Sequence, residues 1–345
     1  ISNFIFIFHR PSPFGSRGFQ TCKRTAKSNF NVKLNEDCLS VNVWAPAEKK
    51  NLPVMVCIFG GGFLSGNPST DYYDGEVLAI HSDVVVVSVN YRLGPFGFLN
   101  LDDDEVPSNL GLLDQQLALR WVYRNVQFFG GDPHNVTIFG NSAGAVFVSA
   151  HMLAKDSWKY FHRAIIQSGG IIAPWAHTSV SKAREASLKL AEYVGCSKGT
   201  TEERMLESLD VIFPDLPMLI KKSIASHFLP QELKMYSADT TVLSDFPYIY
   251  RDILAKIVGD FLFKCSVTKT AEIVPQQHEE AAVFVYHFAE RSSSIKLPAW
   301  MGTTHGHEIQ HVFGGPLRHS NVYTEQEKEF SKLIINLWTS FAATG

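Results

Sequence analysis

Gly140-Asn141-Ser142-Ala143-Gly144 is the stretch that decides the fold of this 345-residue chain. An apolar run at residues 136–139 precedes it, and a helix-compatible segment at residues 145–153 follows it. A G-x-S-x-G between a strand and a helix is typical of a sharp turn that presents a serine nucleophile at the positive end of the helix. Taken alone, the pattern also fits a small-residue turn at a helix start.

A second glycine-rich turn lies upstream and indicates where an oxyanion would bind. Residues 52–59 are apolar and predict a buried strand, and Gly60-Gly61-Gly62-Phe63 follows directly. The N–H groups of Gly61 and Gly62 can approach a ligand because no Cβ blocks them. With the N–H of Ala143 they predict a three-donor oxyanion hole. The alternative interpretation is a flexible glycine turn.

Further motifs carry a resemblance to a known family. The upstream motifs are residues 36–44, 60–66, 90–94, 111–115, 129–133 and 161–169, and the downstream motifs are residues 300–302, 305–309 and 313–317. Their order and spacing resemble the type-B carboxylesterases, and the downstream motifs resemble the cholinesterase branch. The resemblance implies an α/β-hydrolase fold, with a mostly parallel central sheet covered by helices on both faces. It also implies hydrolysis of small carboxylic esters through an acyl-enzyme, without a metal or organic cofactor.

The resemblance implies roles for individual residues. Ser142 matches the nucleophile and His305 the general base, which takes the hydroxyl proton and returns it to the leaving alcohol. His305 stands out among 13 histidines through its motif, and it follows the serine as α/β-hydrolases require. Trp175 matches a position that lines the acyl pocket, although a tryptophan here is also compatible with a core role.

The third catalytic residue is where the chain departs from the family. The family has a glutamate between the serine and the histidine, and this chain has no matching stretch. It is also shorter than the family pattern around residues 196–260, where Asp215 and Glu232 are weak candidates. Loss of the acid lowers turnover by about 10⁴ in serine proteases. The alternative function is therefore a catalytically impaired or inactive adhesion or binding protein on the same fold.

Two departures bear on the substrate. The loop from Cys22 to Cys38 resembles the disulfide loop in which cholinesterases hold a tryptophan that faces the choline ammonium, but it contains no tryptophan. Asn141 stands where cholinesterases have a glutamate. Both differences favour a general carboxylic ester over a choline ester.

The cysteines indicate an oxidising compartment, and the two ends of the chain indicate that it is part of a longer protein. The resemblance implies a disulfide between Cys22 and Cys38. It also implies that others of the five cysteines belong to disulfides whose partner cysteines this sequence lacks. Such a disulfide framework favours a secreted or extracellular location. A reduced cytosolic protein is the alternative. We expect residues 1–345 to form a single α/β-hydrolase domain, incomplete at its N- and C-termini and shortened around residues 196–260.

Composition and one competing motif test other functions. The net charge is −3, and the chain has neither a Lys/Arg run that would indicate nucleic acid nor an apolar stretch of transmembrane length. His307-Glu308-Ile309-Gln310-His311 formally matches a zinc-protease H-E-x-x-H. Glycines and a proline follow it closely and no third ligand is evident, so we expect no metal site.

Hydrophobic patterning predicts the remaining elements. We expect strands at residues 39–44, 54–59, 84–89, 136–139, 164–167 and 283–288, and residues 1–8 alternate like a strand. A helix is predicted at residues 114–128, with Leu117, Trp121 and Val122 near one face. The resemblance implies an ion pair between Arg92 and Glu36.

Overall fold

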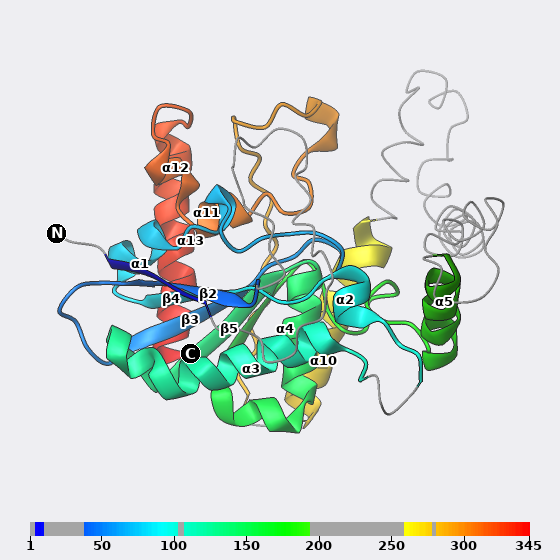
Figure 1. Cartoon of the computed structure of the whole chain (residues 1–345). Coiled ribbons are helices and arrows are strands. Elements are labelled where there is room, and N and C mark those ends of the chain that lie inside the picture. Colours follow the sequence, from blue (N-terminus) through cyan, green and yellow to red (C-terminus); the bar gives the residue numbers. More distant parts are fainter. Residues whose placement is uncertain (1–3, 10–37, 103–106, 194–258, 278–280) are drawn as a thin grey trace, which may run out of the picture. The chain divides into compact units, whose positions relative to one another are not determined.

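The computed structural model describes residues 4–9, 38–102, 107–193, 259–277 and 281–345 (Figure 1). The chain divides into two compact units. The first consists of Ile1–Phe98, Asn109–Ile172 and Val267–Gly345, and the second of Leu99–Ser108 and Ala173–Ser266. The expectation of one domain over residues 1–345 stays a prediction.

A mixed, mostly parallel sheet forms the centre of the first unit, as expected of an α/β-hydrolase. Its strand order is β1-β2-β4-β3-β5-β6. The β3–β4, β3–β5 and β5–β6 pairs are parallel, whereas β1–β2 and β2–β4 are antiparallel. The strands are β1 (Phe4–His9), β2 (Ser40–Ala45), β3 (Leu52–Ile58), β4 (Val85–Val89), β5 (Gly131–Asn141) and β6 (Arg163–Gln167).

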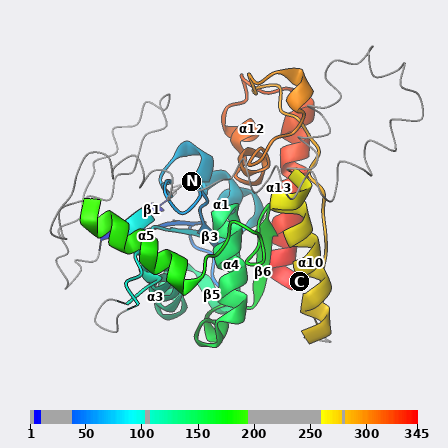
Figure 2. The same cartoon turned by 90° about the vertical axis from the view of Figure 1, so that its right-hand side faces the viewer.

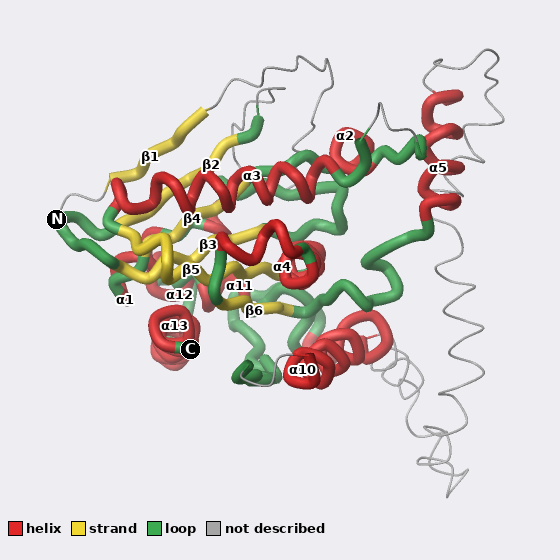
Figure 3. Tube along the Cα trace, turned by 90° about the horizontal axis from the view of Figure 1, so that it is seen from below, coloured by secondary structure: helices red, strands yellow, loops and turns green. Residues whose placement is uncertain are grey.

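Helices cover both faces of this sheet. Side chains of a strand point alternately to the two faces, so an apolar strand such as β3 presents apolar side chains to helices on both faces. On β3, Val54 and Val56 pack with the residues of α3 and α4, whereas Met55 packs with those of α1 and α13. Figure 3 shows α3 and α13 on opposite sides of the strands. The helices are α1 (Glu76–Ser82), α2 (Gly94–Phe98), α3 (Leu110–Asn125), α4 (Ala143–Leu153), α11 (Ile309–Val312), α12 (Gly315–Arg318) and α13 (Glu325–Thr344). The 3₁₀ turns are η1 (Asp71–Tyr73), η2 (Val126–Phe129), η3 (Lys155–Tyr160) and η6 (Ala299–Met301).

The predicted helix at residues 114–128 exists, but its predicted face was wrong at one position. Leu117 is exposed, whereas Gln115, Leu119 and Val122 are buried. A step of two residues turns an α-helix by about 200°, so Leu117 points away from the face that carries Gln115 and Leu119. The buried face of this helix includes polar side chains, so the pattern of hydrophobic residues alone did not identify it.

The predicted strand at residues 283–288 is absent from the described structure, where these residues have no regular secondary structure. Alternate aromatic side chains of the segment contact the C-terminal helix α13 instead. The ring pairs are Phe284 with Phe341, Tyr286 with Trp338, and Phe288 with Phe330. Period-2 alternation indicates only an extended backbone with two different sides. Here one side contacts a helix, and the segment does not pair with β6.

The second unit is described by its own contacts. It contains α5 (Val180–Tyr193), the π-helical turn η5 (Asp260–Lys264) and the start of α10 (Cys265–Gln277), which continues into the first unit. Ser187 of α5 accepts a hydrogen bond from the N–H of Asn100 at 2.9 Å, and Arg184 donates to the carbonyl of Leu101 at 3.1 Å. Among the helices that the structure describes, none is both long and apolar enough to cross a bilayer.

Arg92 forms a bidentate ion pair with Asp114 of α3. Its Nε and Nη2 atoms donate to the two carboxylate oxygens at 2.8 and 2.7 Å, and its backbone N–H donates to Oδ2 at 3.0 Å. The Asp114 side chain is 5% exposed and that of Arg92 29%. Glu36, the partner that the resemblance implied for Arg92, lies outside the described residues.

Asp114→Ala should lower the free energy of unfolding by about 2 to 3 kcal/mol, because it leaves the half-buried Arg92 guanidinium without its partner. Glu329→Ala also removes a helical carboxylate, but it breaks an exposed pair with Lys332 and should cost under about 1 kcal/mol. Urea unfolding of both variants measures the difference. Equal losses would contradict a structural role for the Arg92–Asp114 pair.

Candidate active site

The turn at Ser142 has the backbone geometry of a nucleophile elbow. Strand β5 ends at Asn141, helix α4 begins at Ala143, and Ser142 between them has φ 58° and ψ −122°. A non-glycine residue at positive φ is strained and persists only where neighbouring contacts hold it. Here the Ser142 N–H donates to the carbonyl of Gln167 at 2.8 Å, and its carbonyl accepts from Val146 at 3.1 Å.

Glycines let the ends of β3 and β5 approach each other behind this elbow. A Cβ on Gly144 would lie 2.0 Å from the Ile58 carbonyl oxygen, and one on Gly60 would lie 2.4 Å from that of Asn141. Neither distance is possible for real atoms, and the obstacle in each case is backbone. The glycines of the two predicted turns therefore serve one close contact, which joins the candidate oxyanion loop to the candidate nucleophile.

The predicted oxyanion donors lie on the two sides of this contact. Gly61 and Gly62 have φ of 137° and 61°, and their N–H groups form no backbone hydrogen bond with the described part of the chain. The Gly61 carbonyl accepts from Ser65 at 3.1 Å, which fixes the turn. Ala143 is the first residue of α4, where a backbone N–H has no partner within the helix. The absence of such partners among the described residues is compatible with an oxyanion role for the three N–H groups, which stays a prediction.

His305 lies between η6 and α11, outside regular secondary structure. Protein atoms around the ring desolvate its charged form and lower its pKa below the ordinary value of 6.5. The residue keeps an exposed surface, so solvent tempers this effect. The neutral ring is the form that accepts a proton. The Ser142 hydroxyl itself forms no hydrogen bond within the described residues, and such bonds often tighten only when substrate binds.

A buried polar network ties the segment of His305 to the elbow. Glu308, three residues after His305, accepts a hydrogen bond from Asn141 Nδ2 and a second from Gln167 Nε2 at 3.4 Å. Gln167 in turn accepts from Trp338 Nε1 of α13 at 3.4 Å. Burial raises the pKa of Glu308, and hydrogen bonds from its own backbone, Asn141 and Gln167 offset part of this effect. The network thus includes Asn141, the residue that directly precedes Ser142.

Sequence reasoning noted Asn141 and Glu308 but missed their contact, and it missed Gln167. The signal for Gln167 is a polar residue at the end of an apolar strand. Parallel strands end at one edge of a sheet, and Asn141 and Gln167 are register partners on β5 and β6. No local feature of the sequence indicates that Glu308 comes to the same edge.

The zinc interpretation of residues 307–311 finds no support in the geometry. Helix α11 covers only Ile309–Val312, so the two histidines are not on one helix face. His307 contacts Thr304 through both ring nitrogens, and His311 is fully buried against Phe288 and Phe330. The described residues include no group of three or more His, Cys, Asp and Glu side chains that could hold a metal ion.

Most of the other predicted site residues belong to the second unit or lie outside the described residues. Trp175 belongs to the second unit, where its Nε1 donates to the carbonyl of Leu262 at 2.7 Å. Its role in an acyl pocket stays a prediction. The acid candidates Asp215 and Glu232, and the cysteine Cys22, lie outside the described residues. Cys38 is described and half-buried, and its pairing with Cys22 also stays a prediction.

Comparison with known proteins is consistent with this geometry. The model of the carboxylesterase family matches residues 11–214 and 217–345. The chain is 36% identical to acetylcholinesterase 4 of Caenorhabditis briggsae, 35% to cholinesterase of Mus musculus and 36% to acetylcholinesterase of Bungarus fasciatus. The alignments cover 92%, 92% and 95% of this chain, but only 68%, 66% and 67% of the respective relatives. The chain thus spans about two thirds of the length of these proteins.

Asn141→Asp should make stability fall more steeply as pH rises. The pKa of Glu308 is already raised above its ordinary value of 4.5, so the folded state binds this proton more tightly and loses stability as pH rises above that value. A second carboxylate at position 141 raises the shared pKa further, because two adjacent carboxylates resist joint ionisation. Thermal unfolding between pH 5 and pH 8 measures the effect.

Asn135→Asp provides a matched control on the same strand. Asn135 Oδ1 accepts from Arg163 Nη1 at 2.5 Å, so an aspartate there gains a cationic partner and should lose no stability over the same pH range. If the two variants showed the same pH dependence, the assignment of Glu308 as the partner of Asn141 would be wrong.

Proposed function

Because the chain belongs to the carboxylesterase family, we propose that it is a serine hydrolase that cleaves carboxylic esters by two-step acyl transfer. The observation that carries the proposal is the hydrogen bond from Asn141 to Glu308. It joins the residue before the candidate nucleophile to a residue three positions after the candidate base. The bond thereby joins two segments far apart in the sequence, one with the candidate nucleophile and one with the candidate base, and this supports the proposal.

In the proposed mechanism, Ser142 attacks the ester carbonyl carbon while His305 takes the hydroxyl proton. The N–H groups of Gly61, Gly62 and Ala143 stabilise the negative charge that develops on the carbonyl oxygen. His305 then returns the proton to the departing alcohol oxygen, which leaves an acyl group on Ser142. Water attacks this ester by the same route, with His305 again the base. The carboxylic acid is released and the Ser142 hydroxyl is regenerated.

The electrostatics of the site suit the base role. Desolvation of the His305 ring by the surrounding protein lowers its pKa below the ordinary value, which favours the neutral ring that is able to accept a proton. Glu308, three residues after His305, accepts hydrogen bonds from the side-chain amides of Asn141 and Gln167. We infer that Glu308 supports the geometry of the site and takes no proton from the reaction.

For the substrate we infer an uncharged carboxylic ester. The relatives named as cholinesterases show which branch of the family the chain resembles. The amide of Asn141 carries no charge, and its Nδ2 is engaged by Glu308, so it offers a cationic alcohol group no anionic partner. The predicted Cys22–Cys38 loop contains no tryptophan for a cation–π contact. The cysteine pattern also favours secretion, which we keep as a proposal.

A second candidate is a non-catalytic binding protein on the same fold. It is favoured by one observation, the absence from the sequence of a stretch that matches the family's glutamate acid. Reaction with a fluorophosphonate separates the two candidates, because it requires an activated serine and does not depend on knowledge of the natural ester.

Wild-type protein should form a covalent fluorophosphonate adduct on Ser142, which peptide mass spectrometry locates. Ser142→Ala should abolish the adduct, while Ser149→Ala, which alters a buried serine on α4, should retain it. A folded wild-type protein without an adduct on Ser142 would overturn the catalytic proposal and favour the binding protein.

The rate of hydrolysis of an activated ester should rise with pH through a midpoint below the ordinary histidine pKa of 6.5 and then reach a plateau. The rise reports deprotonation of His305, whose pKa lies below 6.5, and only the neutral ring can act as base. His305→Gln should remove the pH-dependent part of the rate. A pH profile that is unchanged in this variant would show that another group acts as the base.

A further inference from the structure

Residues 289–304 lead to His305, and we refer to them as the approach loop. Within them only the short turn η6 is regular secondary structure. A candidate base at the end of such a loop needs other interactions to fix it, because catalytic groups must be held within about 0.5 Å of a productive position.

Side-chain to backbone hydrogen bonds close the approach loop on itself. Arg291 donates from Nη1 to the carbonyl of Gly302 at 2.7 Å and from Nη2 to that of Leu297 at 2.6 Å. Thr303 Oγ1 donates to the carbonyl of Ala289 at 2.8 Å. The two ends of the loop are thereby held together just before His305.

A buried carboxylate fixes this closed loop to helix α13. Glu327 Oε1 accepts from Ser292 Oγ and from the Ser293 N–H, both at 2.7 Å. Its Oε2 accepts from Ser293 Oγ at 2.6 Å and from the N–H and Oγ1 of Thr324, both at 2.8 Å. Glu327 is 3% exposed. Burial opposes its ionisation, but the bonds from Ser293, Ser292 and Thr324 outweigh that effect and lower its pKa to about 2.

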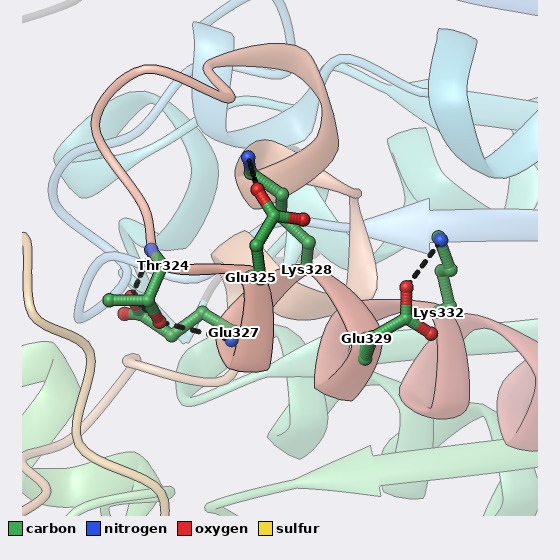
Figure 4. Close-up of polar contacts among 6 residues, drawn as sticks. All are labelled: Thr324, Glu325, Glu327, Lys328, Glu329 and Lys332. Carbon is green, nitrogen blue, oxygen red and sulfur yellow. Dashed lines mark hydrogen bonds and ion pairs between the residues drawn. The ribbon is translucent and has the colours of Figure 1, made fainter.

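The acidic residues of this helix end differ in what they contact, as Figure 4 shows. Glu327 forms the capping box with Thr324, whereas Glu325 and Glu329 pair with Lys328 and Lys332 of the same helix. A capping box needs only the Thr324 contacts. The three donors from Ser292 and Ser293 exceed what capping requires, and all of them come from the approach loop.

Helix α13 is itself a rigid support. Its Ile334, Ile335 and Trp338 are buried in the core on one face of the sheet. Its Ser331 Oγ donates to the carbonyl of His311 at 2.8 Å, which fixes the chain after His305 as well. The helix therefore holds the chain on both sides of His305, through Glu327 before it and through Ser331 after it.

We propose that Glu327 is a positioning residue for the general base, which it holds in place by fixing Ser292 and Ser293 of the approach loop to the N-terminus of α13. The proposal rests on the proposed function, because it assigns a purpose to the loop only if His305 is the base. Glu327 touches neither the nucleophile nor the substrate in this scheme.

Glu327→Gln tests the proposal, because an amide has one acceptor oxygen where the loop and the cap together need two. We expect kcat for an activated ester to fall about tenfold to a hundredfold with KM within about twofold of wild type, as for a misplaced catalytic group. Glu329→Gln is the matched control: it removes the same charge from the same helix, and kcat should stay within about twofold of wild type.

A second pair of variants separates positioning from folding. Ser292→Ala combined with Ser293→Ala removes loop donors but leaves the capping box intact, so the protein should fold and still lose about tenfold in kcat. Thr324→Ala removes the cap, so it should lower the melting temperature more than the double variant does and lower kcat less.

The outcomes distinguish this proposal from the one on which it rests. If wild-type protein forms no fluorophosphonate adduct on Ser142, the proposed function fails, and the role of Glu327 fails with it. If wild type reacts and both Glu327→Gln and the double serine variant keep the kcat of Glu329→Gln, the positioning role alone is overturned. A loss of kcat confined to Glu327→Gln and the double variant, with KM unchanged, supports it.

Discussion

The close approach of the ends of β3 and β5 is the constraint on which the candidate site depends. Gly60 and Gly144 have no room for a Cβ, because the carbonyls of Asn141 and Ile58 occupy that space. This contact brings the glycine loop after β3 beside the elbow after β5. It also holds Ser142 at a positive φ that an isolated peptide would avoid. The candidate nucleophile and the candidate oxyanion loop are therefore brought together by one backbone contact.

Two polar connections extend this rigid centre to segments that have little secondary structure of their own. Glu308 connects the chain after His305 to Asn141 and Gln167 at the carboxyl edge of the sheet. Glu327 connects the chain before His305 to α13. Both carboxylates are buried, and each accepts several hydrogen bonds, which offset the cost of burying it. Burial with paired donors makes these connections specific, since a carboxylate without its donors would be expensive to keep in the interior.

Local sequence patterns gave good predictions where one face of one element decides the structure. The strands β3, β4 and β5 were predicted from short, mostly apolar runs that are buried on both faces, whereas apolar and polar residues alternate at the start of β2, and phenylalanine and isoleucine alternate in β1. The patterns misled where packing uses polar or aromatic residues in other ways. Leu117 looked like core but lies opposite the buried Gln115, and residues 283–288 alternate because they contact a helix.

The sequence by itself determined the fold class, the family and the identity of the candidate nucleophile, oxyanion donors and base. The two glycine turns are local motifs at fixed spacings, and the resemblance of several motifs to one family implies the rest. Only the tertiary structure decided how His305 is supported. Glu308 and Asn141 are 167 residues apart and Glu327 and Ser292 are 35 apart, and hydrogen bonds of this kind leave no periodic trace in the chain. Hydrophobic periodicity records which face of an element is buried, whereas polar pairing depends on where the packed elements happen to meet.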